Sequence, residues 1–108
     1  MPKKLTPEGA MPSLVEERLR VWGRCIRAQR ITQRITTLQL ADRMNISRAT
    51  LQRLERGDVG ASTGNYMRAF LVLGILDVVA PVPPQRFWQE TEGKRVVHAG
   101  GRAHDDDF

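Results

Sequence analysis

Residues 47–56 hold the side chains whose types and spacing are best suited to chemistry. Arginine can bind guanine through two hydrogen bonds, glutamine can bind adenine in the same way, and an alanine methyl can contact the thymine methyl. Four such residues lie outside the apolar stripe of Leu51 and Leu54: Arg48, Ala49, Gln52 and Arg53. We therefore expect these four side chains to contact base edges in a DNA groove, with Arg48 and Arg53 binding guanine.

Residues of the type that bind phosphate surround these four positions. Hydroxyl groups, guanidinium groups and helix N-termini all donate hydrogen bonds to phosphate oxygens. The candidates are Thr36, Thr37, Ser47, Thr50, Arg43 and Arg56, with Arg68 as a further one. The alternative for each arginine is a solvated surface charge.

Capping residues predict the helices that must position these side chains. Ser13, followed three residues later by Glu16, predicts a capping box at the start of a helix that runs to about residue 33. Thr36, Ser47 and Ser62 are also typical N-caps. Further helices are expected at residues 37–44, 48–56, 63–73 and 77–80, with glycines 57 and 74 as stops. The expected inward residues are Leu19, Trp22, Ile26, Leu40, Ala41, Met44, Ile46, Leu51, Leu54, Met67, Phe70, Leu71 and Leu73.

The second and third of these helices are separated by a turn of only a few residues. Ala41 is small where the two helices should cross, and Asn45 tolerates the left-handed conformation that ends a helix abruptly. Ile46 would then anchor the turn in the core. This spacing predicts a helix-turn-helix, which leaves the polar face of residues 48–56 free to enter a groove.

The segment that begins at Thr36 resembles the helix-turn-helix of the XRE family, which includes lambdoid phage repressors and Cro. The matching residues are Thr36, Leu40, Ala41, Ser47, Thr50, Glu55 and Gly57, with apolar replacements at Ile46, Leu51 and Leu54. The departures are Thr37, Asn45 and Gln52, of which Gln52 bears on the choice of base. The resemblance implies an all-α, five-helix, lambda-repressor-like domain, a structural ion pair between Arg30 and Glu55, and a repressor that binds an operator as a homodimer.

Residues 54–62 and 73–77 are similar to XRE regulators of the HipB type. That similarity implies an autorepressing antitoxin whose partner is a HipA-like kinase toxin. Two alternatives remain open. One is a phage-type or standalone repressor without a toxin, and the other is a protein-interaction module on the same fold.

Composition favours a polyanion-binding protein and argues against several other classes. The chain has 108 residues, enough for one domain, and a net charge of +5. Residues 13–80 carry 11 arginines against 6 acidic residues. Cys25 is the single cysteine, and no apolar run approaches the roughly 20 residues that cross a bilayer. We expect no signal peptide and a cytoplasmic, nucleoid-associated protein.

We also expect neither an enzyme nor a cofactor. His98 and His104 do not have the spacing of a metal site, and no phosphate loop or paired nucleophile and base can be placed.

Prolines divide the chain into three parts. Residues 1–12 are predicted to form a flexible arm, residues 13–80 the DNA-binding domain, and residues 81–108 a C-terminal tail. The tail either forms a small β-hairpin from residues 87–89 and 95–98 or is disordered. The expected partner or dimer contacts are Phe70, Ile75, Val78, Val79, Phe87 and Trp88.

Overall fold

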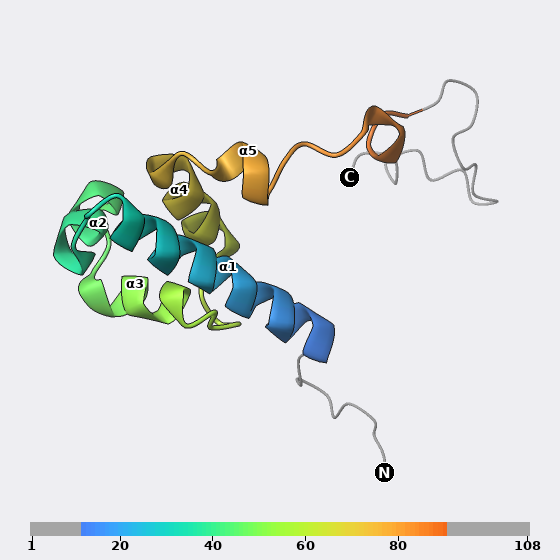
Figure 1. Cartoon of the computed structure of the whole chain (residues 1–108). Helices are drawn as coiled ribbons and strands as arrows, with labels where there is room; N and C mark the ends of the chain where they lie inside the picture. The colour runs from blue at the N-terminus through green and yellow to red at the C-terminus, as the bar shows by residue number, and fades with distance from the viewer. Residues whose placement is uncertain (1–11, 91–108) are drawn as a thin grey trace, which may run out of the picture.

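The computed structural model describes residues 12–90, and within that range the chain is helical and contains no strand (Figure 1). The helices are α1 (Ser13–Thr32), α2 (Thr37–Met44), α3 (Arg48–Glu55), α4 (Thr63–Leu73) and α5 (Leu76–Val79), followed by the 3-10 helix η1 (Gln85–Phe87). The long helix α1 packs against both α3 and α4, while α2 also contacts these two helices and α5 packs against α4. The predicted all-α class and its five helices are confirmed.

Hydroxyl side chains begin three of the helices, as the sequence predicted. Thr36, Ser47 and Ser62 accept hydrogen bonds from the backbone N–H three residues further on, at 3.0, 3.0 and 3.2 Å. At α2 the cap is reciprocal, because the amide of Thr36 donates to the side chain of Gln39 at 2.9 Å. These bonds satisfy amides that the first turn of a helix leaves without a partner.

The predicted cap of α1 is wrong. Pro12 occupies the N-cap position, and Ser13 is the first helical residue and makes no capping bond. The ring of Pro12 holds its φ at −58°, and its carbonyl accepts the amides of Val15 and Glu16. The proline therefore fixes the entry to the helix without help from a hydroxyl. Helices α3 and α5 also end one residue earlier than predicted, a difference of the size expected at helix ends.

The core lies where α1, α2, α3 and α4 meet. Its fully buried side chains include Ile26, Leu40, Met44, Leu51, Leu54, Tyr66 and Phe70. Trp22 packs edge-on against Tyr66 and Phe70, with ring centroids 5.6 and 5.1 Å apart.

The predicted inward face of α4 is partly wrong. Met67 and Leu71 are exposed, at 39% and 64%. The buried positions are instead Tyr66, Ala69, Phe70 and Leu73, which follow the spacing of a single helical face. Tyr66 can be buried because its hydroxyl donates to the carbonyl of Asp58 at 2.8 Å.

Two glycines allow α1 and the C-terminal end of α3 to touch. A Cβ on Gly23 would lie 2.6 Å from the carbonyl oxygens of Leu54 and Glu55, and one on Gly57 would lie 2.6 Å from the Cα of Arg20. Gly57 also has a φ of +76°, which side chains other than glycine rarely adopt. No larger residue fits at this crossing.

The segment after α5 differs from the predicted hairpin. Residues 85–87 form η1 rather than leading into a strand, and the indole Nε1 of Trp88 donates to the carbonyl of Pro83 at 2.9 Å. The predicted second strand, at residues 95–98, lies outside the described residues. No helix within residues 12–90 combines the length and the apolar composition that crossing a membrane requires.

Candidate nucleic-acid interface

Helix α3 has one face in the core and another in solvent. Leu51 and Leu54 are completely buried, while Arg48, Ala49 and Gln52 are exposed. The helix runs along the outside of the bundle (Figure 1). Three of the four candidate base-contacting side chains are therefore accessible from outside the domain.

The turn between α2 and α3 sets the direction of α3. Asn45 has a left-handed backbone, with φ 57° and ψ 45°, and the amide of Ile46 donates to the carbonyl of Ala41 at 3.0 Å. Ile46 packs against the core, and Ser47 then begins α3. The left-handed residue stops α2 at once, and the chain begins α3 after only three residues.

A buried ion pair attaches α3 to α1. The Nε of Arg30 donates to Oε2 of Glu55 at 2.7 Å, and its Nη2 donates to Oε1 at 3.2 Å. The third guanidinium nitrogen, Nη1, donates to the carbonyl of Ile35 at 3.1 Å. Only about a tenth of either side chain is exposed. The two residues expected to form the structural pair thus hold α3 at its C-terminal end and take no part in the exposed face.

Arg53, the fourth candidate base-contacting residue, is only partly free. Its Nε donates to Oδ2 of Asp58 at 2.9 Å, and 42% of its side chain is exposed. The hydrogen bond and charge of Asp58 raise the pKa of Arg53, and the hydrogen bond from Arg53 lowers the pKa of Asp58. Sequence reasoning missed Asp58. The available signal was the segment Gly-Asp-Val-Gly, because an aspartate in a turn often accepts a hydrogen bond from the amide two residues further on.

The candidate phosphate-binding residues differ in their exposure and in the hydrogen bonds that they already make. Arg43 and Arg56 are exposed, as is Thr36 at the start of α2, whereas Thr37 is half-buried. Around the start of α3, the hydroxyl of Ser47 donates to Oγ1 of Thr50 at 2.9 Å. That contact uses one of the two hydroxyl protons and leaves the other available for an external acceptor.

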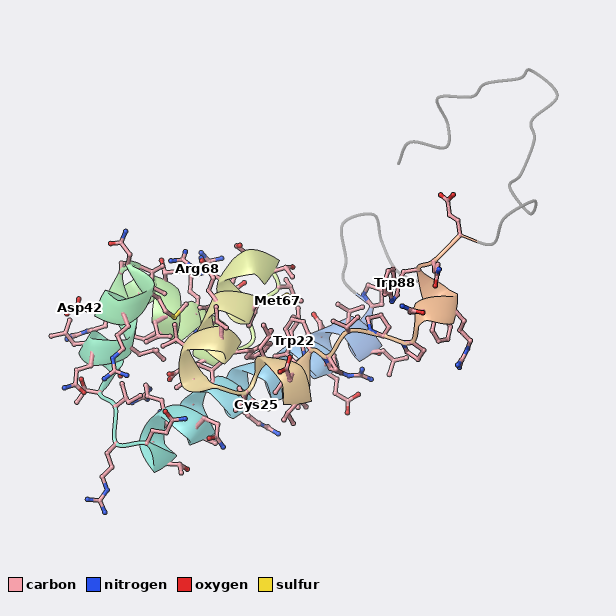
Figure 2. The ribbon with its side chains drawn as sticks, turned by 90° about the horizontal axis from the view of Figure 1, so that it is seen from above. Trp22, Cys25, Asp42, Met67, Arg68 and Trp88 are labelled. Atoms are coloured by element: carbon pink, nitrogen blue, oxygen red, sulfur yellow. The ribbon has the colours of Figure 1, made fainter. Side chains whose placement is uncertain are left out.

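Arg68, the further phosphate candidate, is exposed and also makes a structural contact. Its Nη2 donates to the carbonyl of Met44, so that the side chain joins α4 to the end of α2 (Figure 2).

The residues expected to contact a partner are not all on the surface. Phe70 is fully buried, so that assignment is wrong: its ring fills the core beneath Trp22. Ile75 and Val79 are half-buried against the core. Val78, Phe87 and Trp88 are exposed, and the guanidinium of Arg86 lies 4.6 Å from the centre of the Phe87 ring.

Within residues 12–90, no group of histidine, cysteine and acidic residues is arranged to hold a metal ion. His98 and His104 lie outside the described residues.

Residues 26–75 match the family model described as helix-turn-helix. Within this segment, α2, the turn at Asn45 and α3 follow one another in the order of a helix-turn-helix. The segment begins at the last turns of α1 and ends just before α5, so it contains both the ion pair and the exposed face of α3. Neither the comparison with curated proteins nor that with solved structures gives a match.

A helix-turn-helix domain is a DNA-binding regulatory domain, and the match supports a DNA-binding transcription regulator. In helix-turn-helix proteins that bind DNA, the second helix of the motif enters the major groove, and α3 occupies the corresponding position in this chain.

Proposed function

We propose that this protein is a sequence-specific transcriptional repressor that places α3 in the major groove of an operator. The observation that carries the proposal is the exposed polar face of α3, formed by Arg48, Ala49 and Gln52 on a helix whose opposite face is buried. The guanidinium group of Arg48 can form two hydrogen bonds with guanine, and the side-chain amide of Gln52 can form two with adenine.

Charge around α3 supports the same proposal. Arg43 at the end of α2 and Arg56 at the end of α3 are exposed, and the chain as a whole has a net charge of +5. With Thr36 and Thr50, these side chains are suited to phosphates on either side of the groove. They would fix the orientation of α3 without selecting a base.

We also propose that the repressor is a homodimer. Two copies of α3 related by a two-fold axis can bind half-sites about one helical turn apart, which raises both affinity and specificity. The region of α4 and α5 offers a suitable surface, because Leu71 and Val78 are 64% and 80% exposed. Val82 and Phe87 extend this apolar character beyond α5.

We propose more specifically that the repressor is an autorepressing antitoxin. It would be bound to the nucleoid in the cytoplasm and paired with a HipA-like kinase toxin. Its support is the similarity of residues 54–62 and 73–77 to HipB-type regulators. Co-purification of a kinase-like protein encoded beside this chain, together with repression of their shared promoter, is the expected result. Operator binding with no such neighbour would favour a standalone repressor instead.

Selection from a randomised duplex library tests the DNA-binding proposal. We expect one preferred sequence with two half-sites, and an affinity that falls steeply as salt rises because phosphate contacts release counterions. Replacement of Arg48 by alanine should lower the affinity by about 5- to 150-fold and remove the preference at one base pair.

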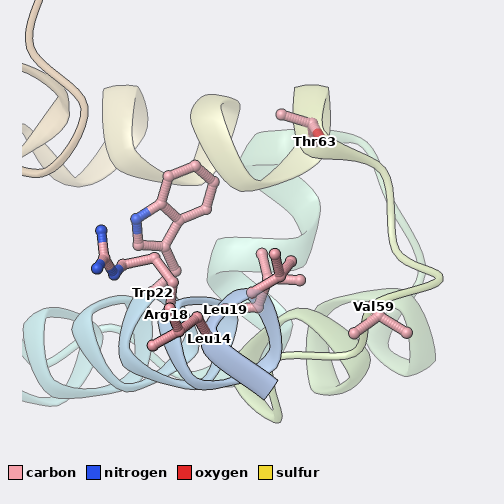
Figure 3. A pocket seen from close by; sticks show the side chains of 7 residues that line it. Leu14, Arg18, Leu19, Trp22, Val59 and Thr63 are labelled. Carbon is pink, nitrogen blue, oxygen red and sulfur yellow. The ribbon is translucent and has the colours of Figure 1, made fainter. Parts of the chain in front are cut away.

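Arg18→Ala is the matched control, since Arg18 is exposed on α1 beside Trp22 and its side chain points away from Val59 (Figure 3). It removes the same charge and should leave the preference unchanged. Equal binding to all duplexes at low salt, or equal effects of the two substitutions, would contradict the proposal.

A further inference from the structure

The loop between α3 and α4 is built around one carboxylate, that of Asp58. Its Oδ1 accepts the amide of Gly60 at 2.7 Å, and its backbone carbonyl accepts the hydroxyl of Tyr66 at 2.8 Å. Its own amide donates to the carbonyl of Arg53 at 3.1 Å. Because Tyr66 is a core residue, the position of Asp58 is fixed by the fold itself.

This fixed carboxylate holds one particular nitrogen of Arg53. The Nε of Arg53 donates to Oδ2 of Asp58 at 2.9 Å, which leaves Nη1 and Nη2 as the nitrogens at the free end of the fork. The guanidinium also lies close to Gly60, where an added Cβ would be 3.1 Å from Nη2. The guanidinium group is thus held at Nε, and 42% of the Arg53 side chain remains exposed.

We propose that Asp58 is a positioning residue, which holds Arg53 so that its two terminal nitrogens bind one guanine of the operator. The inference rests on the proposed function and deepens it. A long arginine side chain loses rotamer freedom when it binds a base, and one that is already held in place loses less. Asp58 should therefore raise the preference for guanine at the position that Arg53 contacts.

The same carboxylate should weaken binding to DNA in general. A negative charge beside the interface repels phosphates whatever the sequence, so it penalises every duplex. Only a duplex with guanine at the correct position recovers this penalty through Arg53. The expected signature of Asp58 is thus higher selectivity together with lower non-specific affinity, which a purely structural residue would not produce.

The pair is charged at neutral pH. The hydrogen bond from Arg53, followed by that from the amide of Gly60, holds the pKa of Asp58 below its ordinary value of 3.8. In the Arg53→Ala variant, the pKa of Asp58, measured by NMR titration of its carboxyl carbon, should rise toward that value. An unchanged pKa would show that the two side chains do not pair in solution and would overturn the inference.

The decisive variant is Asp58→Asn, which keeps an oxygen for the amide of Gly60 and removes the negative charge. On the sequence that the wild-type protein selects, the preference for guanine at one base pair should fall about fivefold or more. Affinity for unrelated duplexes should rise at low salt. Arg53→Ala should lose the preference at the same base pair, and the double variant should lose no more than Arg53→Ala alone.

The possible outcomes distinguish a failure of the proposed function from a failure of the inference about Asp58. If the wild-type protein selects no sequence, the proposed function fails and this inference fails with it. If it selects a sequence and Asp58→Asn retains the full preference, only the inference fails. A uniform loss of affinity with a lower melting temperature would assign Asp58 a structural role and would also overturn it. The ratio of selected to unrelated binding, taken on one sample, does not depend on how much of the variant is folded.

Discussion

At the scale of single residues, the arginines near α3 differ mainly in how much of their hydrogen-bonding capacity the fold already uses. Arg30 is buried, and all three of its guanidinium nitrogens have acceptors. Arg53 has one nitrogen engaged, by Asp58. Arg48 is exposed at the first position of α3. Of these three arginines, Arg48 therefore offers DNA the most donors and Arg30 the fewest.

Replacement of Glu55 by alanine should lower the free energy of unfolding by about 3–5 kcal/mol, because it leaves the charge of Arg30 buried without its partner. Urea denaturation measures the change. Glu16→Ala is the control, since its ion pair with Arg20 is long, at 4.0 Å, and about half exposed. That variant should lose less than about 1 kcal/mol. Equal losses in the two variants would show that the Arg30–Glu55 pair does not hold the helices together.

At the scale of elements, the parts that could be predicted from sequence are those fixed by local chemistry. Thr36, Ser47 and Ser62 begin helices through bonds to amides only three residues away, so the residue type indicates these caps. It failed at Ser13, because Pro12 one residue earlier fixes the start of α1. The inward face of α4 could not be predicted as well, because apolar residues occupy both of its faces. Only packing against Trp22 decides that Tyr66 is buried and Leu71 is not.

In the candidate site, too, some features follow from the local sequence and others depend on tertiary contacts. The exposure of Arg48 and Gln52 follows from the helical spacing of the buried leucines. The restraint on Arg53 depends on the path of the loop after α3, which is set by Gly57 and by the contact of Tyr66 with Asp58. Neither could be derived from periodicity. The close crossing at Gly23 was missed for the same reason, since it is a tertiary contact.

That crossing supports a prediction about α1 and α3. Gly23→Ala should destabilise the protein, because the new methyl group would meet only backbone atoms, at 2.6–2.8 Å. Overpacking of this kind costs about 1–3 kcal/mol and outweighs the gain of about 1 kcal/mol in helix propensity.

Gly64→Ala, near the start of α4, is the matched control, because its methyl group would meet only the Ser62 hydroxyl, at 3.4 Å. It should be neutral or slightly stabilising in thermal denaturation. A Gly23→Ala variant as stable as Gly64→Ala would contradict the tight crossing.

At the scale of the whole molecule, two groups of apolar side chains within residues 12–90 are candidates for a contact with a second copy. One is the region of α4 and α5, with Leu71 and Val78. The other is a hollow of about 490 Å³ between the first turns of α1 and the α3–α4 loop, lined by Leu14, Val15, Leu19, Trp22 and Val59 (Figure 3). Only the first belongs to the surface that we propose for the dimer.

Val78→Asp should therefore convert the proposed homodimer to a monomer, because it would bury a charge at the interface. Sedimentation equilibrium measures the mass, and the variant should bind an isolated half-site as well as the wild-type protein does. Leu14→Asp introduces the same charge at the hollow, on a residue that is 72% exposed, and should leave the dimer intact. A monomeric wild-type protein, or dissociation caused by Leu14→Asp, would contradict this assignment of the surface.

The separation of the two faces of α3 has a consequence for how such a protein can change over generations. Positions 48, 49 and 52 point away from the core and have no role in the Arg30–Glu55 pair. Exchanges at exposed positions of this kind alter stability by no more than about 0.5 kcal/mol. A lineage could thus adopt new target sequences by altering these three positions, while the scaffold beneath them is inherited intact.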